Sequence, residues 1–234
     1  MEPKVVGAAE GWHWYVCGWG LFVKNPGVMI GQFVVLLLIA VILNFVPLIG
    51  SLALALITPV LAGGWFYSIR RLDEDATITI GDIFEGFRNE AWTRPLLILG
   101  IMILVAEVLV GVIVVGLLGI TFLTDVAALE SGLANLSLGF GGLLSLALML
   151  LLLVVLLTAL FFAIPLLLFR QIAPIAALQD SLIASFQHWL PLFVFGLVYL
   201  VAAFFAAIPL GLGFLVLMPV SVCAAFCSYK AIYE

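Results

Sequence analysis

Residues 95–121, PLLILGIMILVAEVLVGVIVVGLLGIT, form an apolar run that is interrupted by a single ionisable side chain, Glu107. A helix of about 20 apolar residues crosses the roughly 30 Å hydrocarbon core of a bilayer. This run is long enough to do so. It therefore predicts a membrane-spanning α-helix with one carboxyl group inside it.

The composition of the whole chain agrees with this prediction. Its 234 residues are 66% hydrophobic and 9% charged, and the mean hydropathy is +1.39. A soluble domain has about a quarter charged residues, so this chain lacks the polar side chains that a water-facing surface needs. The net charge of −5 also argues against nucleic acid as a partner. We expect one integral membrane domain over residues 1–234.

Five more apolar runs lie on either side of the first. The six predicted spans cover about residues 27–46, 51–69, 95–121, 140–169, 191–208 and 212–229. Residues 47–50 and 209–211 are short links with proline and glycine, which favour tight turns. The predicted fold is an all-α membrane bundle of six spans arranged as three hairpins.

The basic residues predict the orientation of this bundle. In the six-span arrangement all eight fall on one side, and the long loop on the other side, about residues 122–139, carries only the acids Asp125 and Glu130. Basic residues concentrate on the cytoplasmic side of membrane proteins. We therefore expect both termini in the cytoplasm. The eight basic residues are Lys4, Lys24, Arg70, Arg71, Arg88, Arg94, Arg170 and Lys230.

A short amphipathic stretch precedes each predicted hairpin, at about residues 11–23, 79–90 and 174–189. In the second stretch, Thr79 and Asp82 have the spacing of a capping box, and apolar residues then recur at helical spacing. Such stretches are typical of helices that lie in the membrane interface. We predict three interfacial helices on the cytoplasmic side.

The first stretch includes GWHWYVCGWG at residues 11–20, which is dense in aromatic side chains. Tryptophan and tyrosine prefer the headgroup region of a membrane. A metal site needs three or four ligands, and here only His13 and Cys17 share a helical face, so we expect membrane anchors and no cofactor. The predicted interface anchors are Trp12, Tyr15, Trp19, Phe22, Trp92 and Trp189.

Each predicted hairpin also carries a proline in its second helix, at Pro59, Pro165 and Pro219. Proline kinks a helix and frees a backbone carbonyl, which neighbouring helices must satisfy inside a membrane. The recurrence suggests a pseudo-symmetric bundle of three kinked hairpins. The alternative is that prolines near helix ends recur here by chance.

Several short motifs occur in order along the chain: GWGLFVKNPGVMIG from residue 18, VPLIG from 46, TPVLAGGW from 58, ITIGDIFEGF from 78 and AAFCSYKAIYE from 224. This order resembles a family of uncharacterised bacterial inner-membrane proteins, which is distantly similar to the membrane domain of glycerophosphodiester phosphodiesterases. The resemblance implies a multi-pass protein of the bacterial plasma membrane. It carries over no catalytic residues.

Glu107 is the principal candidate for a functional residue. A charge inside a span costs about 2.5–3.5 kcal/mol on insertion scales, so such residues tend to be functional. Glu107 shares a helical face with Gly100 and Gly111, which predicts that it points inward at a close helix contact. Three roles stay open: a hydrogen bond to a freed carbonyl, carriage of a proton or cation, and contact with a partner protein.

The other polar or reactive side chains in the spans predict packing. Thr158 and Tyr199 lie at depth but do not make up a substrate site. The three cysteines are an odd number without the spacing of a disulfide framework, so no disulfide scaffold is implied. Cys223 and Cys227 are one helical turn apart and lack a complementary pair of metal ligands, which favours a packing role.

The sequence contains neither H-E-x-x-H, G-x-S-x-G nor a phosphate-binding loop. We therefore expect no enzymatic activity. The leading hypothesis is a membrane accessory or scaffold protein that packs against a larger complex or against itself. The alternative is a small transporter or channel for a proton, ion or lipid-like solute, with Glu107 as its ionisable group. A role as an enzyme of lipid metabolism rests on the family resemblance alone.

Overall fold

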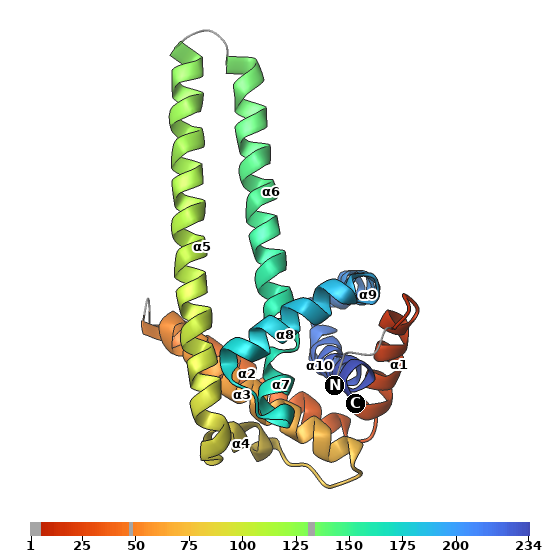
Figure 1. Ribbon diagram of the computed structural model, residues 1–234. Helices are drawn as coiled ribbons and strands as arrows, with labels where there is room; N and C mark the ends of the chain where they lie inside the picture. The colour runs from red at the N-terminus through yellow and green to blue at the C-terminus, as the bar shows by residue number, and fades with distance from the viewer. Residues whose placement is uncertain (1–5, 47–48, 131–133) are drawn as a thin grey trace.

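The structure is a computed structural model that describes residues 6–46, 49–130 and 134–234, and in these ranges its regular structure is helical, without a strand (Figure 1). Six helical segments in this part of the chain are long and apolar enough to cross a membrane, which confirms the predicted all-α, six-span character. They are Pro26–Asn44, Ile49–Asp73, Glu90–Gly116, Ser145–Arg170, Trp189–Ala207 and Phe214–Tyr233.

The helices follow one another with short connections. Proline occupies the first turn of α2 and of α8, where its missing N–H has no cost. In chain order the helices are α1 (Glu10–Phe22), α2 (Pro26–Asn44), α3 (Ile49–Asp73), the 3₁₀ helix η1 (Ile80–Phe84), α4 (Glu85–Arg88), α5 (Glu90–Glu130), α6 (Ala134–Phe161), α7 (Ala163–Arg170), α8 (Pro174–Gln187), α9 (Trp189–Ala207) and α10 (Phe214–Tyr233).

The predicted loop at residues 122–139 is largely wrong. Helix α5 continues to Glu130 and α6 begins at Ala134, while residues 131–133 lie outside the described residues. The loop was expected because Asp125 and Glu130 interrupt the apolar pattern, but isolated acids do not end a helix. The alanine and leucine residues between them are strong helix formers.

Helices α5 and α6 run side by side and extend well away from the other helices (Figure 1). The 41 residues of α5 correspond to a length of about 60 Å at 1.5 Å per residue. Near its start, α5 packs against α3: a Cβ atom added at Gly100 would lie 2.8 Å from the Leu56 carbonyl oxygen. We call the part of α5 and α6 beyond this contact the arm.

The core lies where α1, α3, α7 and α10 meet. Helix α1 packs closely on α10, because a Cβ added at Gly18 would lie 2.6 Å from the backbone nitrogen of Ala224. Many of the most buried side chains come from these four helices, including Trp14, Ile69, Leu166, Phe226, Tyr229 and Ile232. The N-terminal helix is thus part of the packed structure.

The predicted helix at residues 79–90 is divided into η1 and the single turn α4. The capping box is present: the Asp82 carboxylate accepts hydrogen bonds from the Thr79 N–H at 2.9 Å and from the Thr79 hydroxyl at 2.7 Å. This segment lies directly on α3, since added Cβ atoms at Gly64 and Gly86 would meet backbone carbonyls at 2.0 and 2.2 Å. Close packing, rather than helix propensity, therefore shapes it.

The long α6–α7 segment is interrupted at Phe162, three residues before Pro165. The Ser181 hydroxyl of α8 donates to the Thr158 carbonyl at 2.9 Å and accepts from the Phe162 N–H at 3.0 Å. It thereby replaces the helical bond that would join these two groups directly. Ser185 donates to the same carbonyl at 3.1 Å. A neighbouring helix satisfies the interrupted backbone, as expected for a proline-containing span.

Candidate functional site

Glu107 is exposed on α5, in the part of the helix that belongs to the arm. Its neighbours along the helix are apolar and more than half exposed: Val105, Val108, Leu109 and Val112. A carboxyl group thus lies within an apolar surface that nothing else in the described chain covers.

The prediction that Glu107 points inward at a helix contact is wrong within this chain. The face that it shares with Gly100 does meet α3, where Gly100 lies against Leu56. The two helices run in opposite directions there, and α3 begins at Ile49, only seven residues before Leu56. This face of α5 therefore loses its neighbour near Glu107, and an added Cβ at Gly111 would meet nothing within 4 Å.

A cavity of about 340 Å³ lies beside this surface, between α5, α6 and α8. Its lining is apolar and includes Ala106 and Val110 of α5, Leu156 of α6 and Leu182 of α8. Glu107 is not among the lining residues. The carboxyl group and the cavity therefore occupy different faces of α5.

Thr158 and Tyr199 make local packing contacts. The Thr158 hydroxyl donates to the Val154 carbonyl at 2.9 Å within its own helix, while its carbonyl takes part in the α6–α7 interruption. The Tyr199 hydroxyl on α9 lies 3.5 Å from the Met218 sulfur on α10. These contacts do not bring the two residues together with Glu107 in one site.

The predicted aromatic stripe on α1 divides into two parts. Trp12 and Trp19 are 55% and 52% exposed, whereas Tyr15 and Phe22 are buried at 7% and 4%. The division arises because α1 packs on both α9 and α10, so that only part of its circumference stays free. Of the other two predicted anchors, Trp189 is 63% exposed and Trp92 is half-buried, with its ring 5.5 Å from that of Tyr67.

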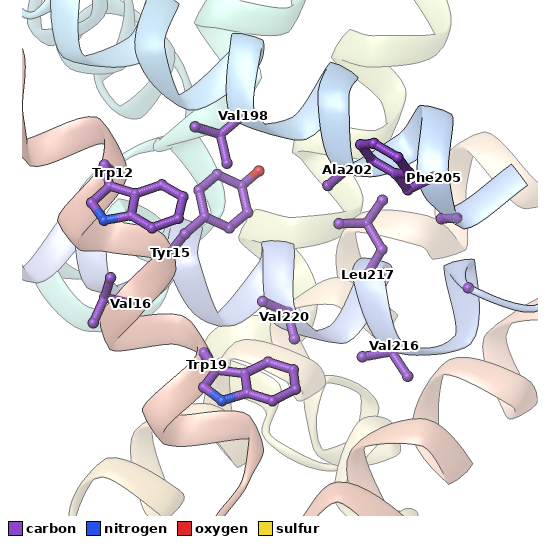
Figure 2. A pocket seen from close by; sticks show the side chains of 12 residues that line it. Trp12, Tyr15, Val16, Trp19, Val198, Ala202, Phe205, Val216, Leu217 and Val220 are labelled. Carbon is purple, nitrogen blue, oxygen red and sulfur yellow. The ribbon is translucent and has the colours of Figure 1, made fainter.

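Three residues of the stripe line a groove of about 610 Å³ (Figure 2). Trp12, Tyr15 and Trp19 form one wall, and apolar residues of α9 and α10, such as Phe205 and Leu217, form the rest. The Tyr15 hydroxyl is buried beneath the surface, near Ser221, and has no hydrogen-bond partner in the described part of the chain. Burial raises the pKa of Tyr15 to about 12.

One end of the molecule carries a network of ion pairs and hydrogen bonds at or just beyond the ends of α1, α3, α7 and α10. Arg70 contacts Glu234 at 2.7 Å, and Lys230 contacts Asp73 at 2.6 Å. The ammonium group of Lys24 donates to Asp75 at 2.5 Å, and this hydrogen bond lowers the pKa of the exposed Asp75 carboxyl. We call this set of paired residues, together with Arg71, Asp82 and Arg170, the polar rim.

Gln32 is a buried polar residue that the sequence analysis missed. It is fully buried on α2, and its amide nitrogen donates to the Ser68 hydroxyl at 2.7 Å and to the Thr79 carbonyl at 2.9 Å. Its amide oxygen has no hydrogen-bond partner among the described residues. The signal was present, because Gln32 is an amide inside an apolar run. It ties α2 to α3 and to the start of η1.

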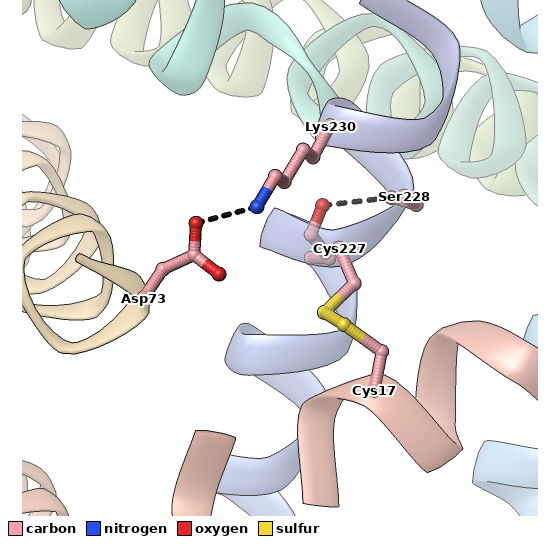
Figure 3. Close-up of a disulfide and its surroundings, with 6 residues drawn as sticks. Cys17, Asp73, Cys227, Ser228 and Lys230 are labelled. Atoms are coloured by element: carbon pink, nitrogen blue, oxygen red, sulfur yellow. Dashed lines mark hydrogen bonds and ion pairs between the residues drawn. A yellow bond between two sulfur atoms is a disulfide. The ribbon is translucent and has the colours of Figure 1, made fainter. Parts of the chain in front are cut away.

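The sequence implied no disulfide scaffold and predicted a packing role for Cys227. That role is incomplete, because Cys17 of α1 and Cys227 of α10 are bonded to each other (Figure 3). Cys223 is free and buried. An odd number of cysteines leaves room for one bond, and the packing of α1 on α10 brings these two Cα atoms to 6.3 Å. The residues described contain no group of three or more His, Cys, Asp or Glu side chains that could hold a metal ion.

Comparisons of this chain with family models, curated proteins and solved structures find no match. The resemblance to a bacterial inner-membrane family therefore stays a prediction from the sequence.

Proposed function

We propose that this protein is a non-enzymatic membrane accessory or scaffold protein, which packs against a larger membrane complex or against another copy of itself. The observation that carries the proposal is the exposed carboxyl group of Glu107 on the apolar surface of the arm.

The free-energy cost of a carboxyl group on this apolar surface supports the proposal. Exposed valine and leucine side chains on a span need no explanation, because lipid tails are equally apolar. A glutamate on the same surface costs about 2.5–3.5 kcal/mol on insertion scales. A hydrogen-bond donor or cation on a neighbouring protein would offset much of this cost, whereas the described chain offers Glu107 no such neighbour at this depth. The same contact would fix the position of this protein relative to its partner.

The proposal includes a membrane arrangement. We place the polar rim and both termini in the cytoplasm of a bacterial cell, following the distribution of basic residues. The six spans then form three hairpins, and the segments at residues 11–23, 79–90 and 174–189 lie at the cytoplasmic interface. Exposed Trp12, Trp19 and Trp189 support this placement, since indole rings favour the headgroup region.

Extraction from native membranes in a mild detergent, followed by mass determination of the intact assembly, tests the proposal. We expect a complex heavier than one chain, and we expect Glu107→Leu to reduce the associated fraction while Glu107→Gln, which keeps hydrogen-bonding capacity, retains most of it. Glu90→Leu at the start of the same helix is the matched control and should leave the assembly intact.

A monomer in native membranes would overturn the proposal, as would an assembly that Glu107→Leu leaves unchanged. A monomer that carries a pH-dependent flux in vesicles, abolished by Glu107→Gln, would establish the alternative of a transporter or channel.

A further inference from the structure

The disulfide links two helices that lie at opposite ends of the sequence, with 210 residues between Cys17 and Cys227. The two partners differ in accessibility: Cys17 is exposed, whereas Cys227 is 4% exposed. One sulfur atom of the bond therefore belongs to a residue that a reagent in water can approach.

The bond lies next to the polar rim. Lys230, which pairs with Asp73, follows Cys227 by three residues on the same helix (Figure 3). In the orientation proposed above, this rim faces the cytoplasm. Disulfides there are rare, because cellular dithiols keep thiols reduced, and those that do form are usually transient or redox-sensing.

We propose that the Cys17–Cys227 bond is a reversible thiol–disulfide exchange site for a cytoplasmic dithiol protein, and that its reduction releases α1 from α10. The inference rests on the proposed orientation. A thiolate of the dithiol attacks the Cys17 sulfur, so that a mixed disulfide forms and Cys227 leaves as a thiolate and takes up a proton. The second thiol of the dithiol then attacks the mixed disulfide and frees Cys17. Two electrons and two protons pass to this protein, and the dithiol becomes a disulfide.

Cys223 does not pair with Cys227. It is fully buried and lies one helical turn from Cys227. Residues four apart on a helix have Cβ atoms about 5–6 Å apart, whereas a disulfide needs about 3.5–4.5 Å. Cys223 is the free thiol of the bonded form, which makes it both a control and a probe.

Reduction would act on the groove. Helix α1 supplies the wall formed by Trp12, Tyr15 and Trp19, and the disulfide is its covalent link to α10. Without the bond, α1 is held there by packing, such as the contact of Gly18 with Ala224. The helix then separates from α10 more often, which opens the groove and exposes Cys223 next to Ala224.

The test uses the full-length protein in intact cells. Thiols are trapped by rapid acid quenching, labelled with a maleimide that adds mass, and resolved on a gel without reductant. We expect a reduced form with two more reactive thiols during growth, and its conversion to the oxidised form when cells are treated with diamide. Cys223→Ser should show the same conversion, and Cys17→Ser should abolish it.

The labelling rate of Cys223 in isolated membranes reports on α1. We expect this labelling rate to increase roughly tenfold or more when the wild-type bond is reduced, because losing a cross-link between residues 210 positions apart favours separation of α1 from α10. A bond that stays oxidised in cells, or one that never forms after diamide treatment, would overturn the inference, and so would an unchanged Cys223 rate.

A separate measurement keeps this inference distinct from the proposed orientation. In a chain whose three cysteines are replaced by serine, Glu74→Cys places one thiol beside the polar rim, because Glu74 contacts Arg70 at 3.0 Å. Labelling of that thiol by an impermeant maleimide from outside the cell would overturn the orientation, and the inference with it. Protection of the thiol combined with a permanently oxidised bond would overturn the redox inference alone.

Discussion

Ser181→Ala tests the interruption between α6 and α7 most directly. The change removes the hydroxyl group that joins the Phe162 N–H to the Thr158 carbonyl. Phe162 is fully buried, so its N–H loses its acceptor without gaining access to solvent. The Thr158 carbonyl keeps its hydrogen bond from Ser185.

The expected loss of stability follows from the hydrogen bonds that are lost and those that remain. Leaving one buried donor unsatisfied costs about 1–3 kcal/mol. Ser185→Ala removes one hydrogen bond but leaves the backbone groups satisfied through Ser181, so we expect a loss near 0.6 kcal/mol, the average for side-chain hydrogen bonds within membranes. The double variant should lose more than the sum of the two, because the Thr158 carbonyl is then unsatisfied as well.

Unfolding of the purified protein by SDS in mixed micelles, followed by tryptophan fluorescence, measures these differences. A Ser181→Ala variant as stable as Ser185→Ala would refute the reasoning, since it would mean that the Phe162 N–H reaches the Thr158 carbonyl directly. Pro165 should prevent this, because its ring clashes with the carbonyl four residues earlier and holds the bend. Adding Pro165→Ala to Ser181→Ala should therefore recover part of the loss.

Three further perturbations test other contacts, each by the same unfolding measurement. Gly18→Ala should lower the free energy of unfolding by about 1–3 kcal/mol, because its Cβ would meet the Ala224 backbone at 2.6 Å. Gly20→Ala, whose Cβ would meet nothing within 4 Å, should be neutral or slightly stabilising. Equal effects of the two changes would contradict the packing of α1. Gln32→Leu should lose about 1 kcal/mol, because the buried Ser68 hydroxyl and the Thr79 carbonyl both lose their bond to the Gln32 amide. A more stable variant would show that the unpaired amide oxygen of Gln32 matters more. Burial raises the pKa of Tyr15 to about 12 from the ordinary value near 10. Its contribution to the free energy of unfolding should therefore be full below pH 10 and be lost as the pH rises toward 12. The Tyr15→Phe variant should not show this loss of stability between pH 10 and 12.

The spans could be predicted from sequence because they depend on local properties. An apolar run of sufficient length has few alternatives to a membrane helix, and the six runs were located within several residues. The predicted outer loop was wrong, although it was also inferred from a local property. Asp125 and Glu130 suggested a loop exposed to water, whereas the helix propensity of the residues between them lets α5 continue to Glu130.

The contacts between helices were less predictable, because they depend on where each neighbour ends. The shared face of Gly100 and Glu107 correctly indicated a close contact at Gly100. The spacing of residues within α5, however, does not reveal where its neighbour α3 begins, and so it could not show that Glu107 lies beyond the contact. The pairing of Cys17 with Cys227 likewise follows from the packing of α1 on α10, which no local pattern reveals. Pro165 was a usable signal for a bend, but the serines that satisfy it come from α8.

The Cys17–Cys227 bond also sets a time order for assembly. Cys17 is synthesised 210 residues before Cys227, and ribosomes add about 5–20 residues per second, so α1 exists for roughly 10 to 40 seconds before its partner cysteine appears. For most of this interval α9 has not been completed, and α10, which contains Cys227, is completed only after the interval ends. The N-terminal helix must therefore wait at the membrane while the spans between are inserted, and the cross-link is among the last contacts to form.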